Sequence, residues 1–327
     1  MNDVTPQDNL AGNIIRPSLK PGSTIGIVSP GRWCDPSWID RPKAFFESRG
    51  YKVAVHLQNY LRAGQLAGSD AERAKGIMDM FADPAVGAMI ATRGGTGSLR
   101  VLDLLDYDFI RRHPKAFIGY SDVTMLLQGI ARRSGIVTYH GPMGWNFAQE
   151  DNSPRTAEDF FAVVGNTGGV CTLRYTEPEC VRPGTAEGVI VGGNIARLQC
   201  MLGTPYDWLG KDAILFLEDV DEVLYRIDGM LTQFRMAGKF DGVRAVLIGE
   251  MTDIIDTETG FARAGEKPYG KNFREIVMEY VPSDVPLCFN FPCGHSSKFI
   301  TTLPIGALAR LTMDASGTEL ALTLPAG

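Results

Sequence analysis

One stretch of the chain decides how its first half folds: Lys115-Ala116-Phe117-Ile118-Gly119-Tyr120-Ser121-Asp122-Val123-Thr124. The apolar run from Ala116 to Tyr120 predicts a short buried strand. After Ser121 the apolar residues recur at helical spacing, at Val123, Leu126, Leu127 and Ile130. The sequence therefore places Ser121 on a turn between a strand and a helix.

A serine on such a turn is suited to nucleophilic catalysis. Its side chain is raised above the C-terminal edge of the sheet, and backbone N–H groups at the helix N-terminus point toward any developing anion. This is the layout of a nucleophile elbow, although Val123 stands where the motif G-x-S-x-G has its second glycine. Serine is also a common helix N-cap, so a purely structural role for Ser121 is the alternative.

Strands and helices alternate on both sides of this turn. A capping box at Ser69-Asp70-Ala71-Glu72 predicts the start of one helix, and another helix is expected over 99–110. The expected strands of this half lie at 24–28, 51–56, 86–91, 116–120 and 136–139. The alternation predicts an α/β domain whose parallel sheet has its ligand site at the C-terminal strand ends.

The alternation stops after residue 146, where prolines and glycine-rich turns follow. We interpret this segment as a connection between two domains, the second of them β-rich and closed by a hairpin over 308–323. The expected division is an N-terminal arm at 1–20, a nucleophile domain at 21–146, a connection at 147–186 and a C-terminal domain at 187–327.

Composition narrows the class of protein. The 327 residues carry 32 Lys and Arg against 38 Asp and Glu, a net charge of −6 without a basic block, so a nucleic-acid partner is not expected. No apolar run reaches the roughly 18 residues needed to span a bilayer, and no secretory signal is visible, which predicts a cytoplasmic protein without a membrane partner. The six cysteines lack a C-x-x-C pair and are expected to be reduced thiols. No cofactor and no metal are expected.

A serine nucleophile needs a base, and the chain has only four histidines. His56 and His113 are expected at the surface. His140 ends an expected strand, and His295 lies in a loop of small residues, so spacing leaves both of these open. For the acid that orients the base, Glu218 at the end of a strand over 213–217 is better placed than Asp122, although an acidic first turn of a helix is the structural alternative for Glu218.

A glycine loop, Gly94-Gly95-Thr96-Gly97-Ser98, follows the strand over 86–91. The third glycine of a dinucleotide-binding fingerprint is missing, and no P-loop lysine is present. In a hydrolase the same loop has another use, because its backbone supplies N–H donors to an oxyanion. We expect the N–H groups of Gly95 and Asp122 to form this oxyanion site.

Ten motifs in the same order resemble the serine LD-carboxypeptidases, peptidase family S66, which includes muramoyltetrapeptide carboxypeptidases and microcin C immunity peptidases. The motifs are Gly26-Ile27-Val28-Ser29-Pro30, Arg93-Gly94-Gly95, Gly97-Ser98, Gly119-Tyr120-Ser121-Asp122, His140-Gly141-Pro142, Gly192-Gly193-Asn194, Leu202-Gly203-Thr204-Pro205, Phe216-Leu217-Glu218-Asp219, Tyr225-Arg226-Ile227-Asp228 and Gly294-His295. The resemblance implies a triad of Ser121, Glu218 and His295, and so favours His295 over His140. It also implies an N-terminal domain like the class I glutamine amidotransferases, a smaller β-rich α+β C-terminal domain, and a homodimer.

Two positions depart from the family pattern. Thr96 stands where the family often has an aromatic residue, and Gly229 stands where it often has arginine. Both changes leave the implied triad intact and concern substrate contacts. Our candidates for those contacts are Arg93, Thr96, His140 and Arg235, of which the arginines match a carboxylate.

The resemblance implies a serine peptidase that removes the terminal D-alanine from a peptidoglycan-derived tetrapeptide. One alternative is an immunity-type peptidase that cleaves peptidyl or aminoacyl nucleotides, and another is a non-catalytic binding protein on the same fold. A nucleobase requires an aromatic surface on which to stack. Trp145 is the one tryptophan expected to reach the cleft, while Trp208 is expected to be structural.

Overall fold

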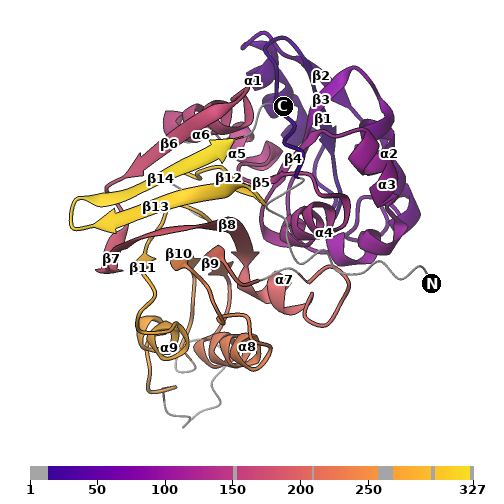
Figure 1. Cartoon of the computed structure of the whole chain (residues 1–327). Coiled ribbons are helices and arrows are strands. Elements are labelled where there is room, and N and C mark those ends of the chain that lie inside the picture. The colour runs from indigo at the N-terminus through magenta and orange to yellow at the C-terminus, as the bar shows by residue number, and fades with distance from the viewer. Residues whose placement is uncertain (1–13, 150–152, 208–209, 257–267, 296–298, 325–327) are drawn as a thin grey trace.

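Five strands from the first half of the chain and one from near its C-terminal end form a six-stranded sheet in the computed structural model (Figure 1). The structure describes residues 14–149, 153–207, 210–256, 268–295 and 299–324. The strand order is β12-β5-β4-β3-β1-β2, and all neighbours are parallel except β12, which runs antiparallel to β5. The strands are β1 (Thr24–Val28), β2 (Lys52–Val55), β3 (Val86–Ala91), β4 (Ala116–Gly119), β5 (Thr138–His140) and β12 (Leu303–Ile305). The predicted α/β domain with a mostly parallel sheet is confirmed.

Helices cover both faces of this sheet, so its central strands are apolar runs without a solvent side. The predicted capping box begins α2, where the Ser69 side chain accepts the N–H of Glu72 and the Glu72 carboxylate accepts the N–H of Ser69. The helices of this half are α1 (Ser37–Glu47), α2 (Asp70–Ala82), α3 (Tyr107–Arg112), α4 (Thr124–Ser134) and α5 (Gly144–Ala148), with short 3₁₀ helices η2 (Leu57–Tyr60), η3 (Ser98–Leu104) and η4 (Ser121–Val123).

The single helix expected over 99–110 is wrong. The chain forms η3 and then, after a break, α3. The break occurs because Asp106 is extended and caps a new helix, its carboxylate accepting the N–H of Phe109 at 2.8 Å. Aspartate favours this N-cap position over a helix interior, which apolar spacing alone does not reveal.

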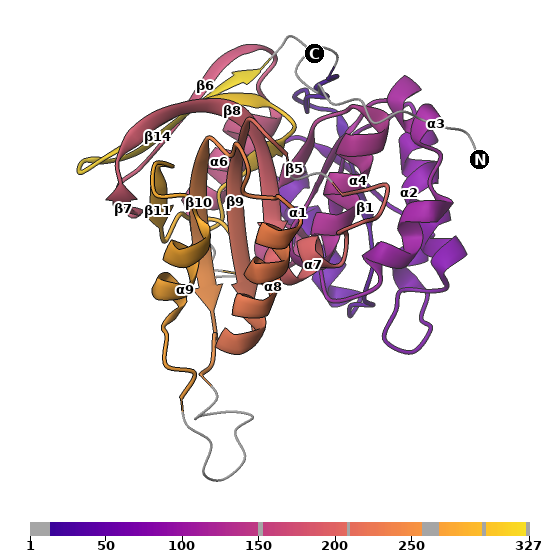
Figure 2. The same cartoon turned by 60° about the horizontal axis from the view of Figure 1, so that its bottom comes forward.

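The second half forms an eight-stranded mixed sheet with the order β6-β14-β13-β8-β9-β10-β11-β7. Its central strands β8, β9, β10 and β11 are parallel, and β13 and β14 form the predicted closing hairpin. The helices α8 and α9 lie side by side along β9 and β10 (Figure 2). The bounds are β6 (Gly169–Tyr175), β7 (Glu179–Arg182), β8 (Gly184–Asn194), α7 (Ile195–Gln199), β9 (Ala213–Val220), α8 (Leu224–Met236), β10 (Ala245–Thr252), α9 (Phe273–Tyr280), β11 (Leu287–Phe289), β13 (Leu308–Asp314) and β14 (Gly317–Leu324).

The segment 147–186, expected as a connection, has regular structure of its own. It contains α6 (Pro154–Val164), β6 and β7, and these strands pair with β14 and β11 in the second sheet. The second sheet therefore has eight strands against six in the first. The exact division into domains stays a prediction.

The two sheets are joined where α4 meets the C-terminal part of β8. The Gln128 side chain on α4 donates to the carbonyl oxygen of Gly192 at 2.6 Å, and the N–H of Asn194 donates to Thr124 Oγ1 at 3.3 Å. Gly193 allows this approach, because a Cβ there would lie 2.5 Å from the Thr124 side chain. The junction brings the C-terminal ends of β4 and β9 toward the same region.

Three further expectations concern the chain as a whole. All six cysteines are free thiols, as predicted. Across the part of the chain that the structure describes, no helix is long and apolar enough to cross a bilayer. Residues 1–13 of the expected arm lie outside the described residues, while Ile15 bridges to Ile136 and Leu19 is fully buried, so the end of the arm is packed against the first sheet.

Candidate active site

Ser121 lies on the predicted turn between β4 and the helix α4, at the start of η4. Its φ of 61° is in the left-handed region, which a residue with a side chain adopts at a cost of about 1–3 kcal/mol. The N-cap position of α4 is occupied by Val123, and no side-chain cap bond is made there. The structure therefore does not support the N-cap role that was the alternative for Ser121.

Glu218 and His295 form a hydrogen-bonded pair. The Nδ1 atom of His295 lies 2.8 Å from Oε2 of Glu218, whose side chain on β9 is fully buried. Burial alone would lower the pKa of His295, but the Glu218 carboxylate outweighs it and raises the pKa above the ordinary value of 6.5. The carboxylate thus fixes the orientation of the imidazole ring and favours its protonated form.

Glycines let these side chains approach one another. Gly294 has a φ of +115°, and a Cβ on it would lie 3.0 Å from Cβ of Glu218. A Cβ on Gly94 would lie 2.8 Å from Cβ of Ser121 and 2.9 Å from its Oγ. The glycine loop and the Cys293-Gly294-His295 turn therefore pack directly against the candidate catalytic residues.

Ser121 and His295 face the same cavity of about 630 Å³, which lies between the two sheets. The six-stranded sheet and its loops supply one wall, and β8, β9 and the segment after β9 supply the other. The lining residues are Trp38, Arg93, Gly94, Gly95, Tyr120, Ser121, Met143, Trp145, Asn194, Ala196, Arg197, Asp219, Val220, Asp221, Glu222, Arg226 and His295. The structure thus brings together residues that lie far apart in the sequence.

The expected oxyanion donors lie beside Ser121. Gly95 lines the cavity, and the backbone nitrogen of Asp122 lies 3.4 Å from the position of a Cβ on Gly94. The Asp122 side chain points away from the Glu218–His295 pair, since its Oδ2 accepts the N–H of Ser98 at 3.0 Å. It is therefore Glu218, and not Asp122, that is hydrogen-bonded to His295.

His140 is the other histidine that spacing had left open as the base, and its surroundings in the structure do not favour that role. Its ring is fully buried and packs edge-on against Tyr120 and Phe216. Burial lowers its pKa to about 4, so the ring is neutral at ordinary pH. It does not line the cavity, and the expected substrate contact is therefore not available to it.

Two further candidates for substrate contact also lie elsewhere. Thr96 is exposed on the outer side of the glycine loop, and Arg235 is exposed in the last turn of α8. Neither lines the cavity. Gly229 is exposed on α8 with nothing within 4 Å of a Cβ, so its departure from the family pattern leaves the cavity unchanged.

Arg93 does line the cavity, and two arginines that sequence reasoning missed join it there, Arg197 on α7 and Arg226 on α8. Arg226 Nε lies 3.2 Å from Oε1 of Glu222, which lines the same wall. Arg226 belongs to the Tyr225-Arg226-Ile227-Asp228 motif of the family resemblance. That motif lies just after the strand of Glu218, and it is the sequence signal from which Arg226 could have been found.

Asp219 is a second buried acid on the cavity wall that was not proposed as a site residue. Burial and then the neighbouring Glu218 charge raise its pKa to about 6. Its carboxylate accepts the Asn194 side-chain amide at 2.8 Å and the backbone N–H of Ala196 at 3.0 Å. Asp219 thereby ties β9 to the start of α7.

An aromatic pair forms another part of the wall. The rings of Trp38 and Trp145 lie with centroids 4.2 Å apart at 48°, and the Arg93 guanidinium lies 5.2 Å from the Trp38 ring centroid. Trp145 reaches the cavity as expected, but sequence analysis gave no sign of its partner, which comes from α1. Trp208 lies outside the described residues.

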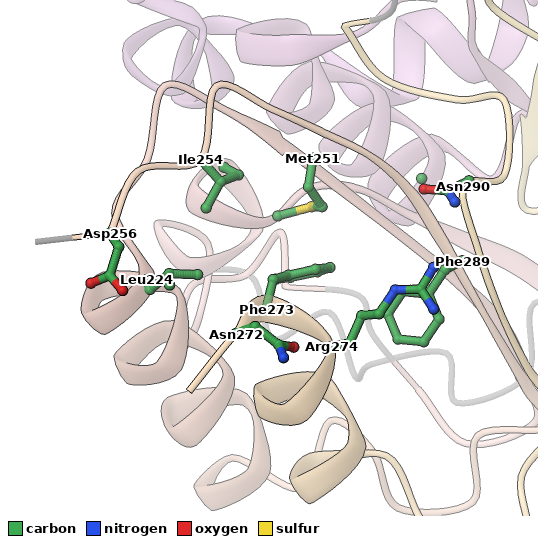
Figure 3. A pocket seen from close by; sticks show the side chains of 10 residues that line it. Leu224, Met251, Ile254, Asp256, Asn272, Phe273, Arg274, Phe289 and Asn290 are labelled. Carbon is green, nitrogen blue, oxygen red and sulfur yellow. The ribbon is translucent and has the colours of Figure 1, made fainter. Parts of the chain in front are cut away.

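A second cavity, of about 470 Å³, lies in the C-terminal half beside α9 (Figure 3). Its walls are largely apolar, and its one arginine, Arg274, lies over the ring of Phe289 and pairs with Glu179. None of the candidate catalytic residues lines it. His56, paired with Asp79 at 3.0 Å, and the exposed His113 also lie away from the site described above.

The sequence matches two family models in succession. Residues 25–141 match the LD-carboxypeptidase N-terminal domain, and residues 187–311 match the LD-carboxypeptidase C-terminal domain. This chain belongs to the LD-carboxypeptidase family. The LD-carboxypeptidase models thus cover the strands that carry both Ser121 and Glu218, together with the loop of His295.

Relatives of this chain include the "Probable murein peptide carboxypeptidase" of Bacillus subtilis, 33% identical over 296 residues that cover 90% of each chain. The solved structure of muramoyltetrapeptide carboxypeptidase from Oxalobacter formigenes is 27% identical, covers 93% of this chain and 100% of that one, and has a TM-score of 0.79. The microcin C7 self-immunity protein MccF of Escherichia coli is 26% identical over 343 residues, 93% of this chain and 94% of MccF. The family therefore contains proteins named for two different substrate classes.

Proposed function

We propose that this protein is a serine LD-carboxypeptidase that removes the C-terminal D-amino acid from peptidoglycan-derived tetrapeptides. The observation that carries the proposal is the 2.8 Å bond between Glu218 and His295 at a cavity that Ser121 also lines. A nucleophile, a base and a carboxylate that orients the base are the three groups that serine hydrolysis requires.

In the first half of the reaction, His295 takes the proton of Ser121 Oγ as this oxygen attacks the carbonyl carbon of the L,D peptide bond. The resulting oxyanion is held by the N–H groups of Gly95 and Asp122. The carbon–nitrogen bond then breaks, and His295 gives its proton to the leaving amine of D-alanine. An ester between the tripeptide and Ser121 remains.

In the second half, water replaces the departed amino acid. His295 takes a proton from the water as it attacks the ester carbon, and the Ser121 oxygen leaves with that proton. Glu218 stabilises the positive charge that forms on the imidazole. The tripeptide is released with a new carboxylate, and the enzyme returns to its starting state.

The charges of the cavity support a peptide substrate with ionised ends. Arg93, Arg197 and Arg226 offer cationic groups for carboxylates, and arginine binds a carboxylate through two parallel N–H donors. Asp221 and Glu222 offer anions to an ammonium group. A murein tetrapeptide has a terminal carboxylate and a diaminopimelate side chain with both kinds of charge.

The Trp38–Trp145 pair supports a second candidate, an immunity-type peptidase for aminoacyl or peptidyl nucleotides. Stacking on aromatic side chains contributes about 1–3 kcal/mol per base. The structural relative MccF has been solved in complex with glutamyl sulfamoyl guanosine, with a TM-score of 0.83 and 23% identity, which shows a shared fold only. We rank this candidate second, because the other lining residues include five charged side chains that suit an ionised peptide, Arg93, Arg197, Asp221, Glu222 and Arg226.

Parallel kinetics on the two substrates tests the proposal. We expect kcat/KM for an L,D-tetrapeptide to exceed kcat/KM for a peptidyl-adenylate analogue, because only the tetrapeptide uses the charged wall fully. Mass spectrometry of both reactions on one preparation measures the release of D-alanine and of the nucleotide product. A clear preference for the adenylate would assign the protein to the immunity-type function.

The pH dependence should report the Glu218–His295 pair. His295 acts as base only when neutral, and its pKa is raised above 6.5, so kcat/KM should fall below a midpoint that lies above pH 6.5. In Glu218→Gln the largest contribution that raises the pKa of His295 is lost, while burial and the smaller contributions of Asp219 and Asp221 remain, so the midpoint should move to lower pH while kcat decreases. The measurement is kcat/KM from pH 5 to pH 9 for the wild type and for Glu218→Gln. Equal midpoints in the two proteins would contradict the pairing of Glu218 with His295.

Activity should survive chelators, because a serine triad needs no metal. Among the described residues no group of three or more His, Cys, Asp or Glu side chains is arranged to hold an ion. We expect the same turnover before and after dialysis against EDTA. Loss of turnover that added zinc restores would contradict the mechanism.

The homodimer stays a prediction that sedimentation can test.

A further inference from the structure

We infer that Asp122 and Arg73 are positioning residues that clamp the glycine loop beside the nucleophile and thereby hold the oxyanion donors in place. The inference rests on the proposed function. It assigns a role to the side chain of Asp122, whose backbone alone enters the mechanism above, and to an arginine that lies outside the cavity.

The Asp122 carboxylate fastens the end of the glycine loop. The side chain is fully buried, and its Oδ2 accepts the backbone N–H of Ser98 at 3.0 Å. Ser98 ends the loop and begins η3. Because Asp122 follows Ser121 directly, this one bond ties the loop to the nucleophile turn.

Arg73 fastens the same loop from the other side. It lies on α2 with a fully buried side chain, and its Nη1 donates to the carbonyl oxygen of Gly97 at 2.8 Å and to that of Pro30 at 2.6 Å. Its Nη2 pairs with Asp70 on the same helix. Burial lowers the pKa of Arg73, and the carboxylates of Asp70 and Asp122 oppose that effect, so the guanidinium stays charged.

The end of β1 completes the arrangement. Gly31 follows Pro30, and a Cβ on Gly31 would lie 2.9 Å from Oδ2 of Asp122 and 2.8 Å from the carbonyl oxygen of Thr96. No side chain fits between these groups. Three segments therefore meet at Asp122: the end of β1, the glycine loop and the nucleophile turn.

Such a clamp matters because the loop is rich in glycine. Gly95 and Gly97 both have positive φ, so their backbone conformations are open to few other residues, and the free chain has many alternatives to them. Loss of one oxyanion donor lowers kcat by about 10²–10³-fold. A loop that no longer holds the Gly95 N–H beside Ser121 is expected to approach that loss without changing substrate contacts.

Two substitutions at Asp122 separate the hydrogen bond from the rest of the side chain. Asp122→Asn keeps an oxygen that accepts the Ser98 N–H, so kcat should stay within about 10-fold of wild type. Asp122→Ala removes the acceptor, so kcat should fall about 100-fold, while KM should stay within about 3-fold. Arg73→Lys reaches one carbonyl instead of two and should give an intermediate kcat with the same unchanged KM.

Asp159→Ala is the matched control, since Asp159 is also a buried aspartate but bonds Tyr175 on the second sheet, away from the cavity. It should lower the midpoint of thermal unfolding and leave kcat per folded molecule unchanged. A clamp is contradicted if Asp122→Ala retains wild-type kcat, if Asp122→Asn is as slow as Asp122→Ala, or if Asp159→Ala loses as much kcat. Should Asp122→Ala not fold, the comparison is between Asp122→Asn, which should keep a kcat near that of wild type, and Arg73→Lys, which should have a lower kcat.

A substrate-independent probe keeps this test separate from the proposed function. A fluorophosphonate reacts with an activated serine: the bond from Ser121 Oγ to phosphorus forms, fluoride leaves, and His295 receives the proton. The phosphoryl oxygen then occupies the oxyanion site. We expect the rate of mass gain to fall about 100-fold in Asp122→Ala and to persist in Asp122→Asn. If the wild-type protein is labelled but does not turn over the tetrapeptide, only the proposed substrate is contradicted. Equal labelling rates in all variants would contradict the proposed clamp.

Discussion

Ser121→Ala is expected to lower kcat by several powers of ten, the largest effect of any single substitution in this protein. Only the oxygen that attacks the substrate is deleted, so no acyl-enzyme can form. Ser121 already has a left-handed φ, which alanine tolerates no better and no worse, so the midpoint of thermal unfolding should be nearly unchanged. The measurement is D-alanine release from a tetrapeptide, with intact mass to detect the acyl-enzyme.

Thr124→Ser is a suitable control for Ser121→Ala, because Thr124 follows the same turn but uses its hydroxyl to accept the N–H of Asn194. Serine keeps that oxygen, so activity should persist. Residual turnover of Ser121→Ala near the wild-type rate, with the same products, would show that another group is the nucleophile.

His295→Ala should be almost as severe as Ser121→Ala, and His140→Ala should not. Removing the base leaves Ser121 protonated, and the groups of a triad act as a unit. The His140 ring is buried and neutral and does not line the cavity, so its loss leaves a hole beside Tyr120 and Phe216 that should destabilise the fold by about 3 kcal/mol. We therefore expect a lower midpoint of thermal unfolding. The kcat should change by no more than about 10-fold, and this change would come through Tyr120, which packs against His140 and lines the cavity.

Each of these two substitutions needs both measurements, turnover and thermal unfolding, on the same preparation. An inactive but stable His140→Ala together with an active His295→Ala would reverse the assignment of the base. Imidazole added to His295→Ala offers a further check, because a small base that fits the vacated space should restore part of the rate.

The position of Ser121 could be predicted from the sequence because every signal for it is local. Four apolar residues, a small turn and a helical repeat all lie within twenty residues of Ser121. The pairing of Glu218 with His295 is different. The sequence places Glu218 at the end of a strand and His295 in a loop, but it does not show which elements meet, and only the family resemblance favoured His295 over His140.

Contacts between distant parts of the chain leave no local periodic pattern, which explains why the expectations for Arg235 and for the segment 147–186 differ from the structure. Arg235 and Arg226 lie on the same helix and look alike in sequence, yet only Arg226, near the start of α8, reaches the cavity. The strands of 147–186 were missed because their partners, β14 and β11, lie more than a hundred residues later in the chain.

The place of β12 bears on how the protein is made. β5 has its outer edge covered by β12, whose residues Leu303–Ile305 belong to the last tenth of the chain. While the ribosome is still adding the second half, the edge of β5 is unpaired, and an open edge is a template for wrong pairing with another chain. Ser121 is thus synthesised early, but its sheet is closed only after Leu303–Ile305 have been added, and a product shortened before Leu303 would keep an open edge at β5.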